Sequence, residues 1–250
     1  MKDNIYKILF YICIPIIGTF FGLFFGIVSQ SFAVNSVSYL GNAVNGNNTD
    51  IYTFSMSFGS ESTDRYLISV VSCTLGSSII GSVKIGGITA TEVSSLTNGS
   101  VSSKIHIAAV PTGTSGNVVI SSGAAMYGCG VALYRATGLN SATAYDNKTS
   151  TASPGSVTIG IAHPGFVIAG TSAGAANFTT TWSGTSNDYD ANIDTFQPLH
   201  FSGGYAQISS PTTVTATRTN NTSPVMVSAS WQYTYTASTR SRFIGFGIQR

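Results

Sequence analysis

The chain has 250 residues, of which 43% are hydrophobic, so it can bury one large β core or two smaller ones. Only 8% of the residues are charged and the formal net charge is +2, whereas an average soluble domain has about a quarter of its residues charged. A protein that tracks phosphates carries a basic stripe, and the sequence has none. We therefore expect a neutral, hydroxyl-rich surface and no nucleic-acid partner.

The first 33 residues carry an export or membrane signal. Lys2 and Lys7 precede an uncharged run, Ile8–Val28, that is long enough to cross a bilayer as a helix. Residues 31–33 (SFA) then offer the small side chains that a signal peptidase prefers. A cleaved signal peptide and a retained anchor that crosses the membrane through residues 8–28 both stay open. Both place residues 34–250 outside the cytoplasm, because the lysines favour the cytoplasmic side.

Three cysteines bear on the compartment. Cys13 lies in the apolar run, which leaves Cys73 and Cys129, both inside strand patterns. An oxidising compartment permits a disulfide between them, and two buried free thiols are the alternative.

The first strand patterns after residue 34 have a period of two. The short apolar stretch Val37–Leu40 suits an edge strand, and Ile51–Phe58 places four large apolar side chains on one face. The next segment, Arg65–Cys73, is apolar on both faces, which predicts a central buried strand.

Residues 82–138 hold four strand patterns with their turns. In Lys104–Val110, apolar Ile105 and Ile107 alternate with Lys104 and His106, which predicts a strand with one wet face and His106 on it. Turn residues follow at positions 111–116, and Asn117–Ser121 continues as a strand. The two strands predict a hairpin.

The C-terminal half continues in the same way. Val225–Tyr235 alternates large apolar side chains with Ser, Met, Gln and Thr, which predicts one packed and one wet face. Further strand patterns occupy 156–161, 165–169, 177–182, 205–208, 213–218 and 243–248. No stretch after residue 33 sustains a period of 3.6. We expect an all-β fold: one antiparallel two-sheet sandwich of the jelly-roll kind over residues 34–250, preceded by one N-terminal hydrophobic helix at 1–33.

One motif suggests nucleophilic chemistry. Residues 170–174 match G-x-S-x-G around Ser172, and aspartates and then His200 follow in the order Ser, Asp, His. The nucleophile elbow needs a strand before it and a helix after it, whereas the residues that follow, AANFTTTW, favour a strand. We interpret the motif as a turn between strands and assign no catalytic residue.

An acidic segment suggests calcium. Asp188, Asp190 and Asp194 resemble the first ligands of a calcium loop. Ile193 and Leu199 stand where an EF-hand needs Gly and Glu, so an EF-hand is excluded. A looser calcium site on the three aspartates stays open beside a solvated acidic loop, and we expect no other cofactor.

The remaining polar signals are weaker. His106, His163 and His200 have no Cys, His or Glu at ligand spacing, so we expect no transition metal. Six N-x-S/T sequons occur, at Asn47, Asn98, Asn147, Asn177, Asn220 and Asn221. The Tyr and Phe residues, 26 in all, either fill the core or present rings to a glycan.

The succession of strands resembles a β-rich virion protein module of tailed bacteriophages, of the tail or fibre type. The resemblance spans residues 37–237 and rests above all on VKIGG (83–87) and VPTGTSG (110–116). It implies a structural role with other copies or virion proteins as partners, and it supplies no catalytic residue. The N-terminal export segment departs from that pattern.

Three hypotheses follow. The first is a non-enzymatic structural or adhesive β-sandwich, exported and displayed on a membrane, outside the cell or on a virion, which meets copies of itself, surface proteins or a cell-surface glycan. The second is an exported filament subunit in which Val34–Leu40 adds as a strand to the next copy. The third is an exported serine hydrolase that uses Ser172.

Overall fold

The computed structural model describes residues 35–76, 79–174, 179–193, 197–218 and 223–234. Contacts divide the chain into Met1–Ala33 and Val34–Arg250, and the described residues belong to the second unit. Within them, no helix is long and apolar enough to span a membrane. The run Ile8–Val28 and the strand expected at 243–248 lie outside them, so the predictions for these segments stay predictions.

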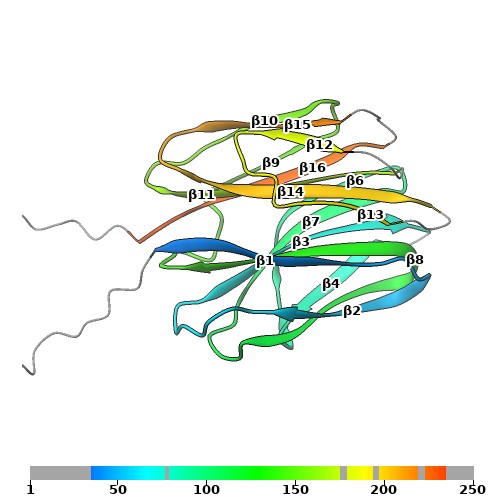
Figure 1. Ribbon diagram of the computed structural model, residues 1–250, viewed down its shortest axis with the longest axis horizontal. Helices are drawn as coiled ribbons and strands as arrows, with labels where there is room; N and C mark the ends of the chain where they lie inside the picture. Colours follow the sequence, from blue (N-terminus) through cyan, green and yellow to red (C-terminus); the bar gives the residue numbers. More distant parts are fainter. Residues whose placement is uncertain (1–34, 77–78, 175–178, 194–196, 219–222, 235–250) are drawn as a thin grey trace, which may run out of the picture. The chain divides into compact units, whose positions relative to one another are not determined.

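The described residues form antiparallel β-strands and no helix, which confirms the all-β class (Figure 1). The strands are β1 (Ser36–Asn45), β2 (Thr49–Ser57), β3 (Tyr66–Leu75), β4 (Ile80–Ile85), β5 (Ile88–Thr89), β6 (Thr91–Asn98), β7 (Val101–Ala109), β8 (Ser115–Thr137), β9 (Asp146–Ser150), β10 (Gly155–Ile159), β11 (Gly165–Ala173), β12 (Thr180–Ser183), β13 (Tyr189–Ile193), β14 (Leu199–Ile208), β15 (Thr212–Arg218) and β16 (Val225–Gln232).

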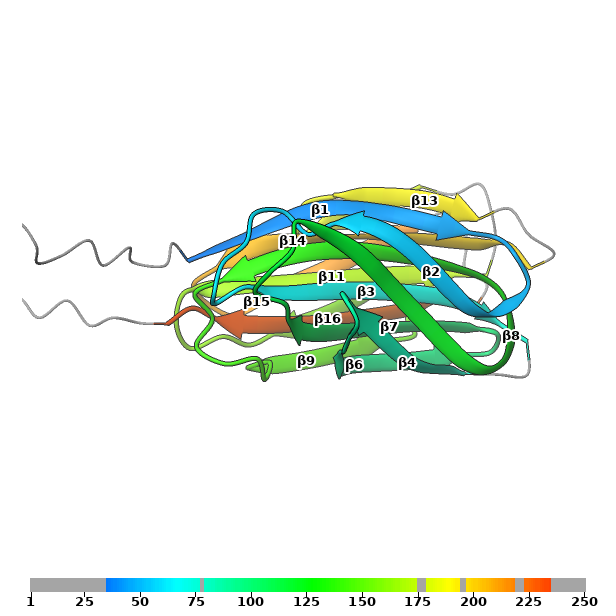
Figure 2. The same cartoon turned by 90° about the horizontal axis from the view of Figure 1, so that it is seen from below.

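Strand β8 determines how the layers stack. Its first half pairs with β2 and β4, and its second half pairs with β1 and β3, with the register shifting near Ser122 and Met126. The eight-stranded sheet therefore folds over on itself into an outer layer and a central layer (Figures 1 and 2). A five-stranded sheet, β13-β14-β11-β16-β9, and a three-stranded sheet, β10-β15-β12, complete four layers.

Three apolar cores separate the four layers. The first core lies between the central layer and the five-stranded sheet and includes Tyr134, Phe166 and Trp231. The second fills the fold of the eight-stranded sheet, and the third lies beneath the three-stranded sheet. Strand β3 is buried on both faces, as its sequence predicts. The expected pair of facing sheets is present, with one further layer on either side.

The extra outer layer overturns two sequence predictions. Strand β7 pairs with β3 and β6, not with β8, so the hairpin prediction is wrong. The predicted wet face of β7 lies under the outer layer, and His106 is only 3% exposed. The sequence pattern was misleading because a polar residue every second position marks solvent only when no further sheet covers that face.

The three-stranded sheet likewise covers the face of β16 that the sequence predicts to be exposed. Val225, Val227 and Trp231 enter the first core as predicted. Met226, Ser228 and Ser230, predicted to be wet, are fully buried beneath β10 and β15. Main-chain oxygens accept hydrogen bonds from the two serine hydroxyls. Ser230 Oγ donates to Gly160 O at 2.7 Å and Ser228 Oγ to Lys148 O at 3.3 Å.

A disulfide links the two strands at the centre of the fold. Cys73 in β3 and Cys129 in β8 are directly paired in register and are bonded to each other. Of the two alternatives for these buried cysteines, the structure has the bond. It ties β3 to β8 on the face of the second core.

The two ends of the described β unit lie together. Asn35 Nδ2 donates to Thr234 O at 3.5 Å, and Thr234 N donates to Gly138 O at 2.7 Å. Strand β1 begins at this end and, among the described strands, pairs with β8 alone, so it is an edge strand, as the sequence predicts. Asn35 and Thr234, the first and last described residues, are therefore neighbours.

Candidate binding surface

The loop between β8 and β9, residues 138–145, lies across the edges of two layers. Trp231 Nε1 donates to Ala142 O at 3.1 Å, and Tyr145 N donates to Ser230 O at 2.8 Å. Ala142 and Ala144 pack on the first core. The loop is thus held by buried residues of β16 while its outer side faces solvent.

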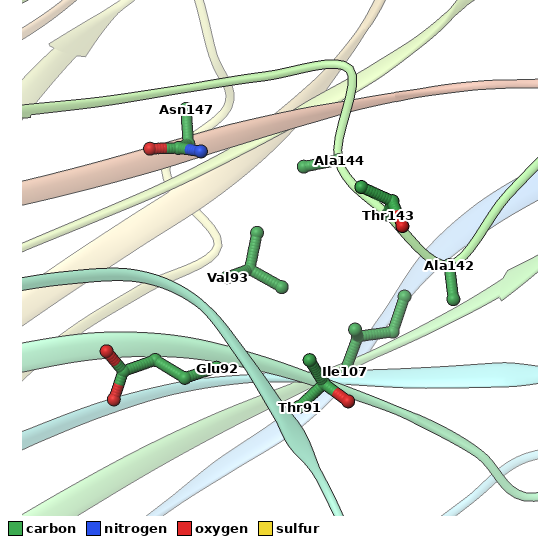
Figure 3. A pocket seen from close by; sticks show the side chains of 8 residues that line it. All are labelled: Thr91, Glu92, Val93, Ile107, Ala142, Thr143, Ala144 and Asn147. Carbon is green, nitrogen blue, oxygen red and sulfur yellow. The ribbon is translucent and has the colours of Figure 1, made fainter.

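A hollow of about 230 Å³ lies on one side of this loop, between it and β6 and β7. In Figure 3 the Val93 side chain points into the hollow, with Ala142 and Ala144 of the loop on one side and Glu92 and Asn147 on the other. The carboxylate of Glu92 pairs with Lys104 Nζ at 2.7 Å, so the hollow has no unpaired described charge at its rim.

A second hollow, of about 280 Å³, lies on the other side of the same loop. It is lined by Asn140, Ser141, Thr143, Tyr145 and Gln232, and the Tyr145 side chain is 52% exposed. With its amide oriented to satisfy both neighbours, Gln232 Oε1 accepts from the N–H groups of residues 162 and 163 at 3.0 and 3.1 Å.

The lining of these two hollows is rich in hydroxyl and carboxamide groups. Hydroxyls and carboxamides both donate and accept hydrogen bonds, and an exposed phenol ring offers a flat apolar face. Such a surface suits an uncharged, hydroxylated ligand such as a saccharide. Tyr145 is the one tyrosine among the large apolar side chains most exposed in the described part of the chain, so the sequence count of 26 rings overstates the rings available there.

A third hollow, of about 390 Å³, brings together the two motifs VKIGG and VPTGTSG. Gly86 and Gly87 of the first motif and Gly113 and Gly116 of the second line it. The ring of Phe58 lies beneath: a Cβ at position 116 would come within 2.6 Å of that ring. The hollow therefore exists because these glycines have no side chains. The two motifs together form one surface of the outer layer.

Arg65 organises the loops around this third hollow. Its side chain is 1% exposed, and its guanidinium donates to six main-chain carbonyls. Nε bonds Val110 O at 2.5 Å, and Nη1 and Nη2 bond the carbonyls of residues 58–60 and 112–113 at 2.7 to 3.3 Å. One buried side chain thus fixes the β2–β3 and β7–β8 loops against each other. No sequence motif marks Arg65 for this role.

The calcium candidates face different partners. Asp188 Oδ1 accepts from Ser186 Oγ at 2.7 Å, and burial raises the pKa of Asp188. Asp190 Oδ1 lies 2.9 Å from His200 Nε2, and its Oδ2 accepts from Thr180 N at 3.1 Å. Asp194 lies outside the described residues, within which no group of three metal-ligating side chains occurs.

Both sequence interpretations treat the acidic segment as a loop, whereas the structure contains a strand there. Residues 189–193 form the edge strand β13, which pairs with β14. Tyr189 and Ile193 enter the first core, while Asp190 and Asn192 lie on the other face. This alternation of apolar and polar side chains is the sequence signal for a strand. The calcium site stays a prediction, which a calcium titration followed by thermal unfolding tests.

The hydrolase residues do not converge. Ser172 lies inside β11, fully buried, and its Oγ is 2.6 Å from Ser103 Oγ across the first core. His200 pairs in register with Ala173, the next residue, so its ring lies on the opposite face of the sheet. Neither the expected turn nor the elbow of a hydrolase is formed at Ser172.

His200 instead belongs to a buried polar cluster between the five-stranded and three-stranded sheets. Its Nε2 is 2.9 Å from Thr180 Oγ1, and its Nδ1 is 3.0 Å from Asn192 Oδ1. Burial lowers the pKa of His200, Asp190 opposes that shift, and Arg218 adds to it. The sequence pointed to Asp190 and His200 separately and gave no sign that Thr180 and Arg218 join them.

The other predicted positions scatter over the unit. His163 is exposed in a turn, and Asn47 and Asn147 are exposed sequon asparagines. Asn98 is half-buried, with Nδ2 donating to Pro224 O at 3.1 Å. The sequons at 177, 220 and 221 lie outside the described residues.

Comparison of the chain with protein-family models, with curated proteins and with solved structures finds no match. The resemblance to a tail or fibre module therefore stays a prediction.

Proposed function

We propose that the chain is a non-enzymatic structural and adhesive protein, displayed outside the membrane or on a virion surface. The observation that supports this most is the stacking of four β layers on three separate apolar cores. The jelly-roll-like pair of sheets at its centre belongs to the same proposal. Such a scaffold has little freedom to rearrange, because its central strands are packed on both faces and joined by a disulfide.

The contact surface in this proposal is the loop at residues 138–145, which meets a neutral glycan. Its support is the combination of the exposed Tyr145 ring with the amides and hydroxyls of Asn140, Ser141 and Gln232. Binding of the purified full chain to an array of neutral and acidic glycans tests it, with Tyr145→Ala as the variant. Ile88→Ala, an exposed side chain of the third hollow, is the matched control. Equal binding by wild type and Tyr145→Ala would contradict this surface.

The placement outside the membrane is tested separately. Intact mass and N-terminal sequencing of the native protein distinguish a start at Val34, which indicates export with cleavage, from a start at Met1, which indicates a retained anchor. Protease treatment of intact cells or particles then checks exposure, because residues 34–250 of a displayed protein are accessible without lysis.

The filament hypothesis has a structural requirement. Residues 36–39 pair with β8 of their own chain, and Val37 is buried in the first core. Donation of this strand to a neighbouring copy therefore requires β1 to leave β8. Negative-stain images at high concentration test it, since monodisperse particles would count against polymerisation.

A further inference from the structure

Arg218, the last residue of β15, is a buried cation with little to neutralise it. It faces the five-stranded sheet beside Thr180, its partner in register, and is 5% exposed. Nη1 donates to Ser172 O at 2.6 Å. Burial lowers the pKa of Arg218 to about 10, so the guanidinium still carries its charge at neutral pH.

Within the described part of the chain, the other edge of the guanidinium has no hydrogen-bond partner. Nε and Nη2 are both buried and neither donates a hydrogen bond. These two nitrogens lie on the same side of the planar group, and their parallel N–H bonds match the two oxygens of a carboxylate or phosphate. A buried charged donor without an acceptor is strongly unfavourable, so an acceptor is expected at this edge.

The described acidic side chains do not supply that acceptor. Asp190, which belongs to the polar cluster around His200, uses Oδ1 toward His200 and Oδ2 toward Thr180. The others have different partners or positions: Asp50 is exposed on β2, Glu61 bonds Gly113 N, Asp64 bonds Gly138 N, Glu92 pairs with Lys104, Asp146 pairs with Lys148, and Asp188 bonds Ser186.

We propose that the Nε and Nη2 edge of Arg218 is a binding site for an oxyanion, a phosphate or carboxylate group held side-on between the five-stranded and three-stranded sheets. The site is independent of the glycan surface proposed above, since it lies between β15 and β11, whereas that surface lies on the β8–β9 loop. Thr180 Oγ1 and Asp190 Oδ1 both lie 2.9 Å from His200 Nε2, which leaves the guanidinium edge as the group that selects for the anion.

The test is thermal unfolding of the full chain in detergent micelles, with inorganic phosphate titrated against potassium chloride at equal ionic strength. Wild type should show a saturable rise in Tm with phosphate. In Arg218→Lys, which keeps the charge and loses the planar pair of donors, the apparent affinity should fall about tenfold or more. Arg135→Lys, on the opposite side of the central layer, is the control and should respond as wild type does.

Asp194→Asn distinguishes a bound anion from a carboxylate of the same chain. A phosphate response in both wild type and Asp194→Asn supports the proposal, whereas a response in Asp194→Asn alone shows that Asp194 occupies the edge and overturns it. An equal response in Arg218→Lys, or none in any protein, also overturns it. If Arg218→Lys does not fold, equilibrium dialysis of wild type with labelled phosphate decides, and failure to bind about one phosphate per chain overturns the site.

Discussion

The ring of Phe201 in β14 lies directly on the backbone of Gly130 in β8, where a Cβ would come within 2.5 Å of the ring atoms Cε1 and Cζ. This contact joins the central layer to the five-stranded sheet inside the first core. The spacing of the two sheets at this point therefore depends on a residue without a side chain.

Gly130→Ala should lower the free energy of unfolding by about 1–3 kcal/mol, because the ring must move or the sheets must separate. Gly123→Ala in the same strand is the control, since its Cβ would meet nothing within 4 Å. Denaturant unfolding measures both. The double variant Gly130→Ala, Phe201→Leu should be less destabilised than the sum of the single variants, and strict additivity would contradict the contact.

Removal of the disulfide should cost about 4 kcal/mol by loop-closure entropy, because Cys73 and Cys129 are 56 residues apart. Guanidinium unfolding of the double variant Cys73→Ala, Cys129→Ala, beside wild type with and without reductant, measures the cost. Wild type under strong reductant should approach the variant. Two reactive thiols in unfolded, unreduced wild type beyond Cys13 would show that the bond is not formed.

Arg65→Lys should destabilise the fold by about 3 kcal/mol or more, since an ammonium cannot reach six carbonyls in two loops and some would be left buried without a donor. The β2–β3 and β7–β8 loops should also become sensitive to limited proteolysis. Arg135→Lys, which loses a bond from Nε to Ser60 O, is the matched control and should change stability by less than about 1 kcal/mol. Unchanged protease resistance in Arg65→Lys would contradict the role assigned to Arg65.

Acid should destabilise the protein partly through His106. Burial lowers the pKa of His106 to about 4, with Glu92 raising it and Lys104 lowering it. The folded pKa of His106 is below the unfolded value of 6.5. The stability that the neutral His106 ring contributes is therefore complete above pH 6.5 and is lost as the pH falls toward 4, a loss of about 3 kcal/mol.

The measurement is the difference in unfolding free energy between wild type and His106→Gln from pH 7.5 to 4. The difference isolates His106 from His200, whose lowered pKa acts in the same direction, and from Asp188, whose raised pKa acts in the opposite direction. His163→Gln is the exposed control. Parallel pH curves for wild type and His106→Gln would contradict the burial of that ring.

Most strand positions could be predicted from the sequence, because apolar alternation and turn residues are local signals. Ile51–Phe58 and Arg65–Cys73 coincide closely with β2 and β3, including which faces are buried. The layers could not be predicted in the same way. Whether Lys104 and Ser228 face water depends on which distant strands cover them, and polar side chains hidden by a further sheet look like surface residues in a local pattern.

The candidate sites show the same limit. A pattern pointed to Ser172, but the alternation of side chains puts its hydroxyl and the His200 ring on opposite faces of one sheet. Conversely, no sequence motif marks Arg65 or Arg218. The role of a buried guanidinium is recognised only from the carbonyls around it, as at Arg65, or from its unpartnered nitrogens, as at Arg218.

The contact between Asn35 and Thr234, at the two ends of the described β unit, bears on how the unit would carry load. A pull on Asn35 along β1 acts parallel to a strand whose nine register pairs with β8 run from Ser36 to Asn45. In an antiparallel pair the hydrogen bonds are perpendicular to the strands, so this pull shears them together and does not open them one by one. The last pair sets Asn45 opposite Cys129, where the disulfide passes the tension to β3 in the middle of the fold. A load applied at Asn35 would thus reach the centre of the fold through one strand and one covalent bond.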